Sequence, residues 1–168
     1  MRIHESCVLI DCENISIGEN VRLDPFCILT VRSHLTIGSH VHISGHVAIV
    51  GVAAVSIGDF AALSHGVKLL TASDDFDGAG IGGPMVPEIH RQVTIGPIAI
   101  GRHAIVGTNA VILPGVTVGE GATIGALSLA KDDIEAWTVN AGAPARAIGT
   151  RPREAVLAAE RTFVDSTQ

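Results

Sequence analysis

The sequence predicts an all-β chain wound as a solenoid of three-sided coils. The segments "SIGENV" at 16–21, "TIGSHV" at 36–41 and "SIGDFA" at 56–61 recur every 20 residues. Within each period an aliphatic residue returns at every sixth position. The chain is 47% hydrophobic but only 3% aromatic, so aliphatic side chains must build the core. A fixed period of this kind is typical of repeat architectures.

The six-residue period fits neither an α-helix nor a simple alternating strand. It fits a coil made of three short strands, with each aliphatic side chain pointing into a narrow interior. The period of 20 then means eighteen residues plus two more at one corner. The fourteen repeat positions, all Ile, Leu or Val, are Ile17, Leu23, Leu29, Ile37, Ile43, Ile49, Ile57, Leu63, Leu69, Ile100, Val106, Ile112, Val118 and Ile124.

Small residues or valines follow many repeat positions by four residues and are expected at tight corners. Glycine directly after the aliphatic residue is expected to allow the bend. A two-sheet β protein with frequent turns is the alternative, but sandwiches do not keep a strict six-residue period. The corner residues are Val21, Val41, Ala61, Ala104, Ala110, Val116 and Ala122.

Bulk properties narrow the class of protein. A chain of 168 residues is expected to form one domain, with the solenoid in 1–150 and a helix and tail in 151–168. The net charge of −6 argues against nucleic-acid binding. No apolar stretch is long enough for a membrane span, and the N-terminus does not look like a signal peptide. Cys7, Cys12 and Cys27 are interpreted as reduced, buried thiols of a cytoplasmic protein.

The repeat stops between residues 70 and 97, which we expect to form an inserted loop. Its glycines and prolines disfavour regular strands, and a loop of this length in a compact domain is usually functional. It ends near His90 and Arg91. The polar residues at its start, which can bind hydroxyl groups or move protons, are Thr71, Ser73, Asp74, Asp75 and Asp77.

The repeat, together with "NAVILPGVTVG" (109–119) and "AGAPARAI" (141–148), resembles the hexapeptide-repeat acyltransferases, and within them the sugar and small-molecule acetyltransferases. The resemblance covers residues 15–150. It implies a left-handed parallel β-helix and a homotrimer with active sites between subunits, walled in part by the loop. It also implies acetyl-CoA as cosubstrate. No metal is expected, because the histidines lack the spacing of a metal site.

The same resemblance implies that acetyl-CoA lies along the outer edge of the late coils. Backbone groups at Thr108 and Ala126, one coil apart, could pair with the pantetheine amides as an added strand does. Gly107 is a candidate N–H donor to the reaction's oxyanion. Basic residues suit the cofactor's phosphates, although each could also be a solvated surface charge. The cofactor-binding candidates are Gly107, Thr108, Ala126, Ser128, Lys131 and Arg146.

Relatives that acetylate simple sugars carry a histidine where "TASDD" (71–75) has Asp74. Three interpretations stay open: Asp74 acts as or orients a base, another histidine substitutes, or the acceptor is an amine that needs no strong base. His65, two positions after Leu63, should point outward and is the first alternative; His90 in the loop is the second. The acceptor-binding candidates are Ser44, His46, Ser73 and Asp75.

The sequence therefore predicts an acetyl-CoA-dependent acetyltransferase acting on a hydroxyl or amino group of a sugar or nucleotide-sugar, in surface polysaccharide or lipopolysaccharide biosynthesis. A metal hydratase like the γ-type carbonic anhydrases is one alternative, but it needs three convergent histidines, and His40 and His42 lack a third spaced ligand. A non-catalytic β-helix scaffold is the other alternative, and it would not bind coenzyme A.

The C-terminal segment "REAVLAAERTF" (153–163) predicts an α-helix rich in alanine. Thr150 is a plausible cap and Pro152 suits the first turn. We expect the helix to cover the open end of the solenoid, because bare strand edges invite aggregation. The tail "VDSTQ" (164–168) is expected to be disordered.

Overall fold

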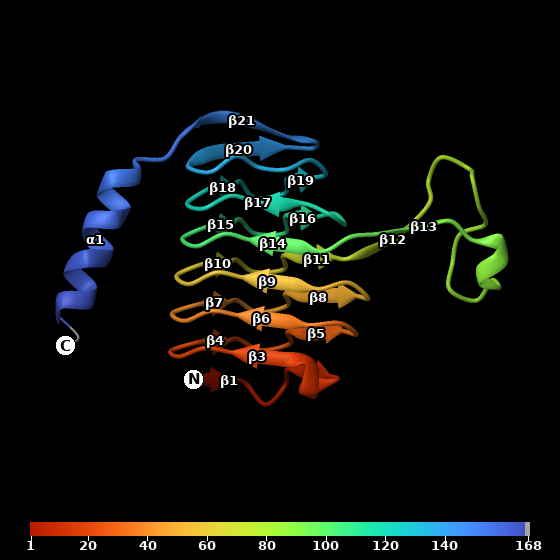
Figure 1. The fold of residues 1–168 in the computed structure, drawn as a ribbon, viewed down its shortest axis with the longest axis horizontal. Helices are drawn as coiled ribbons and strands as arrows, with labels where there is room; N and C mark the ends of the chain where they lie inside the picture. Colours follow the sequence, from red (N-terminus) through yellow and green to blue (C-terminus); the bar gives the residue numbers. More distant parts are fainter. Residues whose placement is uncertain (167–168) are drawn as a thin grey trace.

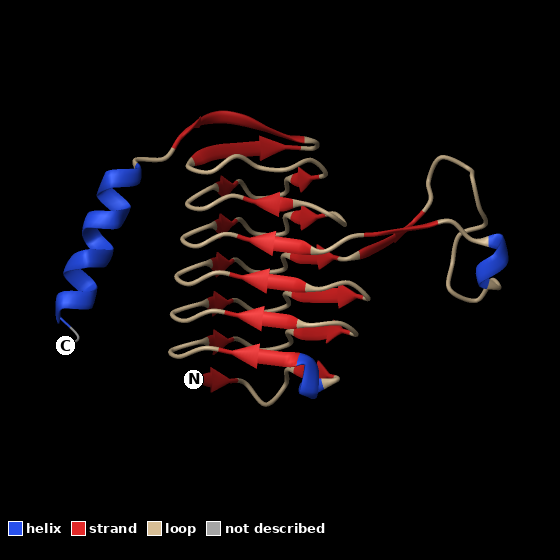
Figure 2. Cartoon of the chain, viewed as in Figure 1, coloured by secondary structure: helices blue, strands red, loops and turns tan. Residues whose placement is uncertain are grey.

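The computed structural model describes residues 1–166, and it has the predicted three-sided parallel β-helix. Successive coils stack along one axis, with a loop projecting on one side and a helix standing on the other (Figure 1). The strands of neighbouring coils lie above one another, as Figure 2 shows. No helix among the described residues is long and apolar enough to cross a membrane.

Three sheets, here named A, B and C, form the sides of the prism. Sheet A contains β1 (Arg2–Ile3), β4 (Arg22–Leu23), β7 (His42–Ile43), β10 (Ala62–Leu63), β15 (Ile105–Val106), β18 (Thr123–Ile124), β20 (Thr138–Gly142) and β21 (Ala145–Thr150). Sheet B contains β2 (Val8–Ile10), β5 (Ile28–Val31), β8 (Ala48–Gly51), β11 (Lys68–Leu70), β16 (Val111–Ile112) and β19 (Leu129–Ala130). Sheet C contains β3 (Ile15–Ile17), β6 (Leu35–Ile37), β9 (Val55–Ile57), β14 (Ile98–Ile100) and β17 (Thr117–Val118).

The predicted repeat positions fill the interior of the prism. In sheet A the parallel register places Ile43 above Leu23, Leu63 above Ile43 and Val106 above Leu63. The fourteen residues are buried, except that Ile17 near the N-terminal end is half-buried. The seven predicted corner residues are also buried, each at most 2% exposed. The register of the sequence prediction is therefore confirmed.

The glycine directly after the aliphatic residue does not make the bend, contrary to our expectation. The bend falls three residues after the aliphatic residue. The glycines with positive φ at that position are Gly66, Gly115 and Gly121. The corners between sheets C and A place non-glycine residues at positive φ, among them His40 at 58°, Phe60 at 59° and His103 at 59°. The glycine after each aliphatic residue instead permits close stacking of coils. A Cβ atom on Gly58 would lie 2.6 Å from the backbone nitrogen of Arg102. Ring stacking helps to offset the backbone strain: the rings of His40 and Phe60 are 4.9 Å apart, and those of Phe60 and His103 are 5.1 Å apart.

The inserted loop begins after β11, which includes Leu70, so it starts one residue later than predicted. The prediction of no regular strands is wrong at its base. Two strands, β12 (Ala72–Asp74) and β13 (Val93–Ile95), form an antiparallel ribbon that carries the loop away from the coils. Farther out, the 3₁₀ helix η2 (Glu88–His90) is the other regular element of the loop; a second one, η1 (Cys12–Asn14), lies in the first coil.

The C-terminal segment does not cap the prism with its helix. The antiparallel strand β21 pairs with β20 and covers the end of sheet A, while helix α1 (Arg153–Ser166) stands beside the prism (Figure 1). Thr150 is the last residue of β21 rather than a helix cap. The helix also includes Val164–Ser166 of the predicted disordered tail; Thr167 and Gln168 lie outside the described residues.

Helix α1 lies along the corner between sheets C and A. Glu160 forms an ion pair with Arg102 and a hydrogen bond of 2.9 Å with His103 Nε2, and Arg151 donates a hydrogen bond to the carbonyl of His103. The Phe163 ring meets His40 edge-on. These contacts explain why the helix packs on the flank: its polar and aromatic partners are on the corner, not at the end of the prism.

The cysteines are free, as predicted, but they differ in burial. Only Cys27 is buried; Cys7 is half-buried and Cys12 is exposed, so the prediction of three buried thiols is wrong. Burial raises the pKa of the Cys27 thiol to about 11. That thiol is therefore protonated at neutral pH and serves as a small apolar side chain.

Leu63→Ala should lower the free energy of unfolding by about 2–5 kcal/mol, because it leaves a cavity in a fully buried site. Chemical denaturation followed by circular dichroism measures the change. Thr36→Ala, on the outward face of sheet C, is the control and should cost under about 1 kcal/mol. Equal effects of the two substitutions would contradict the inward position of Leu63.

Candidate functional site

The predicted site residues fall into two main groups on different parts of the chain. One group lies on the corner between sheets A and B, here called the A–B corner (24–27, 44–47, 64–67, 107–110 and 125–128). The other group lies in the loop, which leaves the corner between sheets B and C (Figure 1). The members on the A–B corner are Ser44, His46, His65, Gly107, Thr108, Ala126 and Ser128.

The A–B corner leaves specific backbone groups available. Leu127 N–H donates to the carbonyl of Thr108, and Asn109 N–H donates to the carbonyl of His65. Among the described residues, the N–H groups of Thr108 and Ala126 have no backbone acceptor. Both residues are exposed. Their N–H groups could thus pair with an extended ligand that runs along this edge.

Two of the predicted cofactor residues at this corner are used inside the fold. Gly107 N–H donates to the carbonyl of Ile124 at 2.8 Å, so it is not free to stabilise an oxyanion. A Cβ atom on Gly107 would lie 2.6 Å from the nitrogen of Ala126, which gives this glycine a packing role. Ser128 is 1% exposed, and its hydroxyl accepts a hydrogen bond from the N–H of Gly142.

Two histidines from successive coils lie next to each other on the same corner, with their rings tilted by 60°. The ring centroids of His46 and His65 are 5.0 Å apart, and the Phe26 ring lies 5.0 Å on the other side of His46. Both histidines are exposed, as expected for His65. Lys68 donates hydrogen bonds from Nζ to the carbonyls of His46 and Gly66, at 3.0 and 2.8 Å. The Lys68 ammonium therefore lies close to this pair of histidines.

Asp74 holds the base of the loop together. Its Oδ1 accepts a hydrogen bond from Arg91 Nη2 at 2.9 Å, and its Oδ2 accepts one from the N–H of Gly83 at 2.9 Å. The Arg91 guanidinium, together with the Gly83 N–H, holds the pKa of the Asp74 carboxyl below its usual range. Asp74 is therefore ionised at neutral pH, which makes it a weak proton acceptor.

The other predicted loop residues have different surroundings. Asp75 accepts hydrogen bonds from the N–H groups of Asp77, Gly78 and Ala79, and the Asp77 N–H followed by that of Ala79 lowers its pKa. It therefore organises a turn. The Ser73 hydroxyl donates to the carbonyl of Asp74 at 3.1 Å. His90 ends η2 and is exposed.

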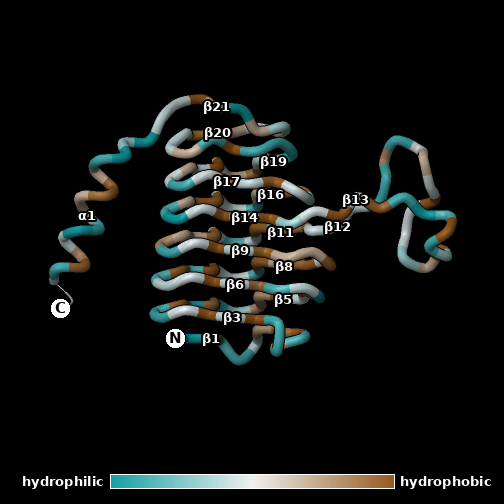
Figure 3. The backbone as a smooth tube through the Cα atoms, in the orientation of Figure 1, coloured by the Kyte–Doolittle hydropathy of each residue, from teal (hydrophilic) through white to brown (hydrophobic). Residues whose placement is uncertain are grey.

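The far part of the loop exposes large apolar side chains that do not reach the core of this chain. Figure 3 shows hydrophobic segments along the projecting loop, away from the stacked coils. Such a cluster is unusual on the surface of a monomer and typical of an interaction site. The residues are Phe76, Ile81, Met85 and Ile89, each at least 60% exposed.

The two remaining cofactor candidates lie near the C-terminal end of the prism. Lys131 is exposed just after β19. Arg146 in β21 forms an ion pair of 3.3 Å with Asp132, and both side chains are more than 60% exposed. An exposed pair of this kind is weak, so a phosphate could replace the carboxylate as the partner of Arg146.

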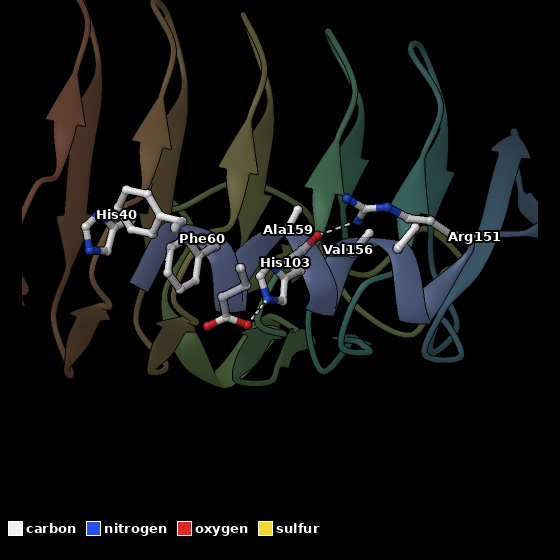
Figure 4. A pocket seen from close by; sticks show the side chains of 9 residues that line it. His40, Phe60, His103, Arg151, Val156 and Ala159 are labelled. Carbon is white, nitrogen blue, oxygen red and sulfur yellow. Dashed lines mark hydrogen bonds and ion pairs between the residues drawn. The ribbon is translucent and has the colours of Figure 1, made fainter. Parts of the chain in front are cut away.

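A groove lies between helix α1 and the corner of sheets C and A, away from the predicted site residues (Figure 4). It encloses about 650 Å³ and is lined by His40, Phe60 and His103 on the prism and by Ala159 and Phe163 on the helix. Burial, followed by the charge of Arg102, lowers the pKa of His103. None of the predicted site residues lines this groove.

The histidine pair considered for a metal does not converge. His42 Nε2 lies 2.8 Å from the carboxylate of Asp24, whereas His40 stacks on Phe60. Among residues 1–166, the structure has no group of three or more His, Cys, Asp or Glu side chains that could hold a metal ion.

Comparison with known proteins places these features in context. Residues 97–129 match the bacterial transferase hexapeptide family (six repeats). The chain is 36% identical over 167 residues to dTDP-4-amino-4,6-dideoxy-D-glucose acyltransferase of Escherichia coli, covering 99% of this chain and 86% of that protein.

Two solved structures are also similar. AntD, an N-acyltransferase from Bacillus cereus in complex with dTDP and 3-hydroxybutyryl-CoA, has a TM-score of 0.94 at 35% identity, covering 98% of this chain and 87% of that chain. A hexapeptide-repeat acetyltransferase from Vibrio cholerae complexed with acetyl coenzyme A has a TM-score of 0.69 at 25% identity, covering 84% and 74%. These similarities confirm the predicted left-handed parallel β-helix and the use of a coenzyme A thioester by proteins of this type.

From the sequence, Arg91 is expected only as a group near the end of the loop that could bind hydroxyls or move protons, and neither Ser64 nor Gly83 is selected. The pairing of Asp74 with Arg91 depends on the antiparallel ribbon, in which Asp74 lies opposite Val93. The segment between these two residues contains glycines and prolines but no repeat, so the sequence does not reveal which residues of the ribbon lie opposite each other. Ser64 precedes His65 on the A–B corner, one coil above Ser44, and only this coil-to-coil equivalence singles it out.

Asp74→Asn should loosen the loop, because the amide keeps the shape of the carboxylate but loses the charge that holds Arg91. Trypsin cleavage after Arg91 at pH 7 should become roughly two- to fivefold faster. Mass spectrometry of the fragments 1–91 and 92–168 measures it. Asp77→Asn, an exposed neighbour, is the matched control and should leave the rate unchanged.

The same contact sets a pH dependence. Because the folded-state pKa of Asp74 is lowered, the stabilisation is present above the usual carboxyl range and is lost as the pH falls through the lowered pKa. Below that value the native loop should resemble the Asn variant. A loop in Asp74→Asn that is cleaved as slowly as the native loop would contradict this assignment.

Proposed function

Because this chain belongs to the hexapeptide-repeat acyltransferases, we propose that it transfers an acyl group from coenzyme A to the amino group of a dTDP-linked amino sugar. Acetyl is the acyl group that we expect. The observation that carries the proposal is Asp74, an ionised carboxylate at the place where sugar O-acetyltransferases have a histidine base. An amine acceptor needs no strong base, since its neutral form attacks a thioester directly.

The chemical step balances without a cofactor beyond the thioester. The neutral amine nitrogen attacks the carbonyl carbon of the acyl thioester and forms a tetrahedral oxyanion. The C–S bond then breaks and the coenzyme A thiolate leaves with the electron pair. The proton released from nitrogen ends on that thiolate or on solvent. The products are an amide and coenzyme A.

The role proposed for Asp74 is to accept a hydrogen bond from the attacking amine and to offset the positive charge that grows on nitrogen. Solved structures of AntD include variants at one serine and at one aspartate, and these two residues lie ten positions apart in that chain. Ser64 and Asp74 are the only serine and aspartate of this sequence, in that order, with the same spacing. This match supports both residues as parts of the site.

The A–B corner is the proposed binding edge for coenzyme A. The available N–H groups of Thr108 and Ala126 are one coil apart and suit the amides of the pantetheine arm. His65 and Ser64 lie toward the N-terminal end of the same corner, where the thioester would meet the acceptor. Lys131 and Arg146 are proposed partners of the cofactor's phosphates. Ser44, His46, Ser73 and Asp75 remain proposed acceptor contacts or supports, as does His90 as a minor alternative base.

We propose that the complete site forms between subunits of a homotrimer. The loop leaves the prism at the corner between sheets B and C, whereas the proposed cofactor edge is the A–B corner. Within one chain, therefore, neither the loop nor the A–B corner closes the site alone. Sheet B, which joins those two corners, exposes Val8, Ile10 and Ile28. An apolar face of this kind, beside an apolar loop tip, suits a second copy of the chain.

An acylated dTDP-sugar is an activated glycosyl donor, because the nucleoside diphosphate is a good leaving group. The reaction therefore fits a pathway that assembles a surface polysaccharide or lipopolysaccharide. The free thiols and the intracellular acyl carrier are consistent with a cytoplasmic reaction. Transfer to a sugar hydroxyl is the second candidate, favoured by the exposed His65 on the cofactor edge.

Release of coenzyme A thiol with a panel of acceptors tests the proposal. We expect turnover with acetyl-CoA and dTDP-linked 4-amino sugars, and at least roughly hundredfold lower kcat/KM with the matching 4-hydroxy sugars. The proposal fails if hydroxyl acceptors are preferred. If the proposal holds, His65→Ala should have little effect on N-transfer. A loss greater than roughly hundredfold in kcat would instead favour the O-transfer mechanism.

Mixing two inactive variants tests the shared site. Ser64→Ala changes the A–B corner and Asp74→Ala changes the loop, and each variant alone is expected to be inactive because both residues are proposed parts of the site. After co-refolding in equal amounts, about a quarter of the sites should combine a native loop with a native corner, restoring about a quarter of the activity. A site within one chain would restore none. Refolding each variant alone is the control.

A further inference from the structure

We propose that Arg91 and Arg32 hold the diphosphate of the acceptor in the cavity between the inserted loop and the corner of sheets B and C, with Asp74 positioning Arg91. The inference rests on the proposed function, because it takes the acceptor to be a nucleoside diphosphate sugar. In this proposal the inserted loop binds the diphosphate of the acceptor, whereas coenzyme A binds at the A–B corner.

The cavity has the size and composition of a small-molecule site. It encloses about 730 Å³, within the range of roughly 300–1,000 Å³ that ligand pockets usually have. Its prism wall comes from three successive coils through Asp11, Arg32 and Gly51, and its loop wall includes Glu88 and Arg91. A single site thus meets both the fixed prism and the projecting loop.

Arg91 is the one arginine of this cavity that the fold holds in place. Its side chain is 19% exposed, and Nη2 is fixed to Asp74 at 2.9 Å. Its Nε is enclosed and has no hydrogen-bond partner among the described residues. A buried donor without an acceptor is costly, so a small rotation that brings the guanidinium onto an anion would be favoured. Arginine binds phosphate oxygens through two N–H groups at once.

The other charges of the cavity agree with a nucleotide sugar rather than a simple anion. Arg32 is exposed on the prism wall, where it can reach a second phosphate oxygen. Asp11 and Glu88 are exposed carboxylates on the two walls, and they suit hydroxyl groups rather than phosphates. The apolar lining from Val52 and Ile95 can cover a base or a sugar ring.

The proposal links acceptor binding to the reacting group. Asp74 contacts Arg91 directly, so a diphosphate on the guanidinium would place the attached sugar beside the carboxylate. Asp74 is thus a positioning residue for Arg91 as well as the proposed partner of the amine. Free amino sugars, which lack the diphosphate, would lose this placement.

Binding of dTDP alone, measured by isothermal titration calorimetry on the full chain without coenzyme A, tests the assignment. Arg91→Gln and Arg32→Gln should each weaken dTDP binding by roughly ten- to hundredfold. Arg91→Lys keeps a charge that can reach Asp74 and should still bind about tenfold more weakly than the native protein. Arg161→Gln, an exposed arginine of α1, is the matched control and should bind normally.

The outcomes separate this inference from the proposed function. If the native chain binds dTDP and acylates dTDP-linked amines while both Arg91 variants bind dTDP normally, the inference is wrong and the function stands. If the native chain acylates only acceptors without a nucleotide, the proposed function is wrong. Coenzyme A binding should be unchanged in all variants; a loss there with normal dTDP binding would assign Arg91 to the cofactor instead. Should Arg91→Gln fail to fold, Arg91→Lys decides.

Discussion

The fold depends on one constraint: each aliphatic side chain of the repeat must lie directly above its counterpart in the coil below. The interior is narrow and filled with aliphatic side chains, and one side of a coil can contribute two of them, as Leu35 and Ile37 do in β6. Parallel pairing at about 4.8 Å spacing then leaves no room for a side chain where consecutive coils touch. Gly58 and Gly107 meet that requirement, since a Cβ atom on either would collide with the next coil.

This constraint moves all chemistry to the outside. Inward positions are occupied by Leu63, Val106 and their equivalents, so polar groups lie mainly on outward faces, at corners or in insertions; buried Asn140, stacked on Ile124 in the last coil, is an exception. The A–B corner offers backbone N–H groups at a regular spacing of one coil, and the loop offers charged side chains in fixed pairs. A rigid edge for the carrier and an inserted loop for the acceptor are a natural division of labour on such a scaffold.

The sequence predicted most of the fold because its signal is periodic. Positions such as Leu63 and Ile112 repeat a short-range rule that needs no knowledge of distant contacts. The location of α1 could not be predicted in this way. It depends on Glu160 meeting Arg102 and His103 and on Phe163 meeting His40, contacts between residues far apart in the sequence. Likewise, the sequence singles out Asp74 as a departure from the family pattern, but its partner Arg91 follows from the ribbon register inside a loop that has no repeat.

Strand β21 runs antiparallel to β20, whereas every earlier pair of neighbouring strands in sheet A is parallel. A parallel edge would accept another coil of the same kind, whether from a duplicated gene segment or from a neighbouring molecule. The antiparallel turn removes that template from sheet A at the C-terminal end. Lengthening of this protein by duplication must therefore take place upstream of Thr138, and a fusion partner joined after α1 would not extend the solenoid.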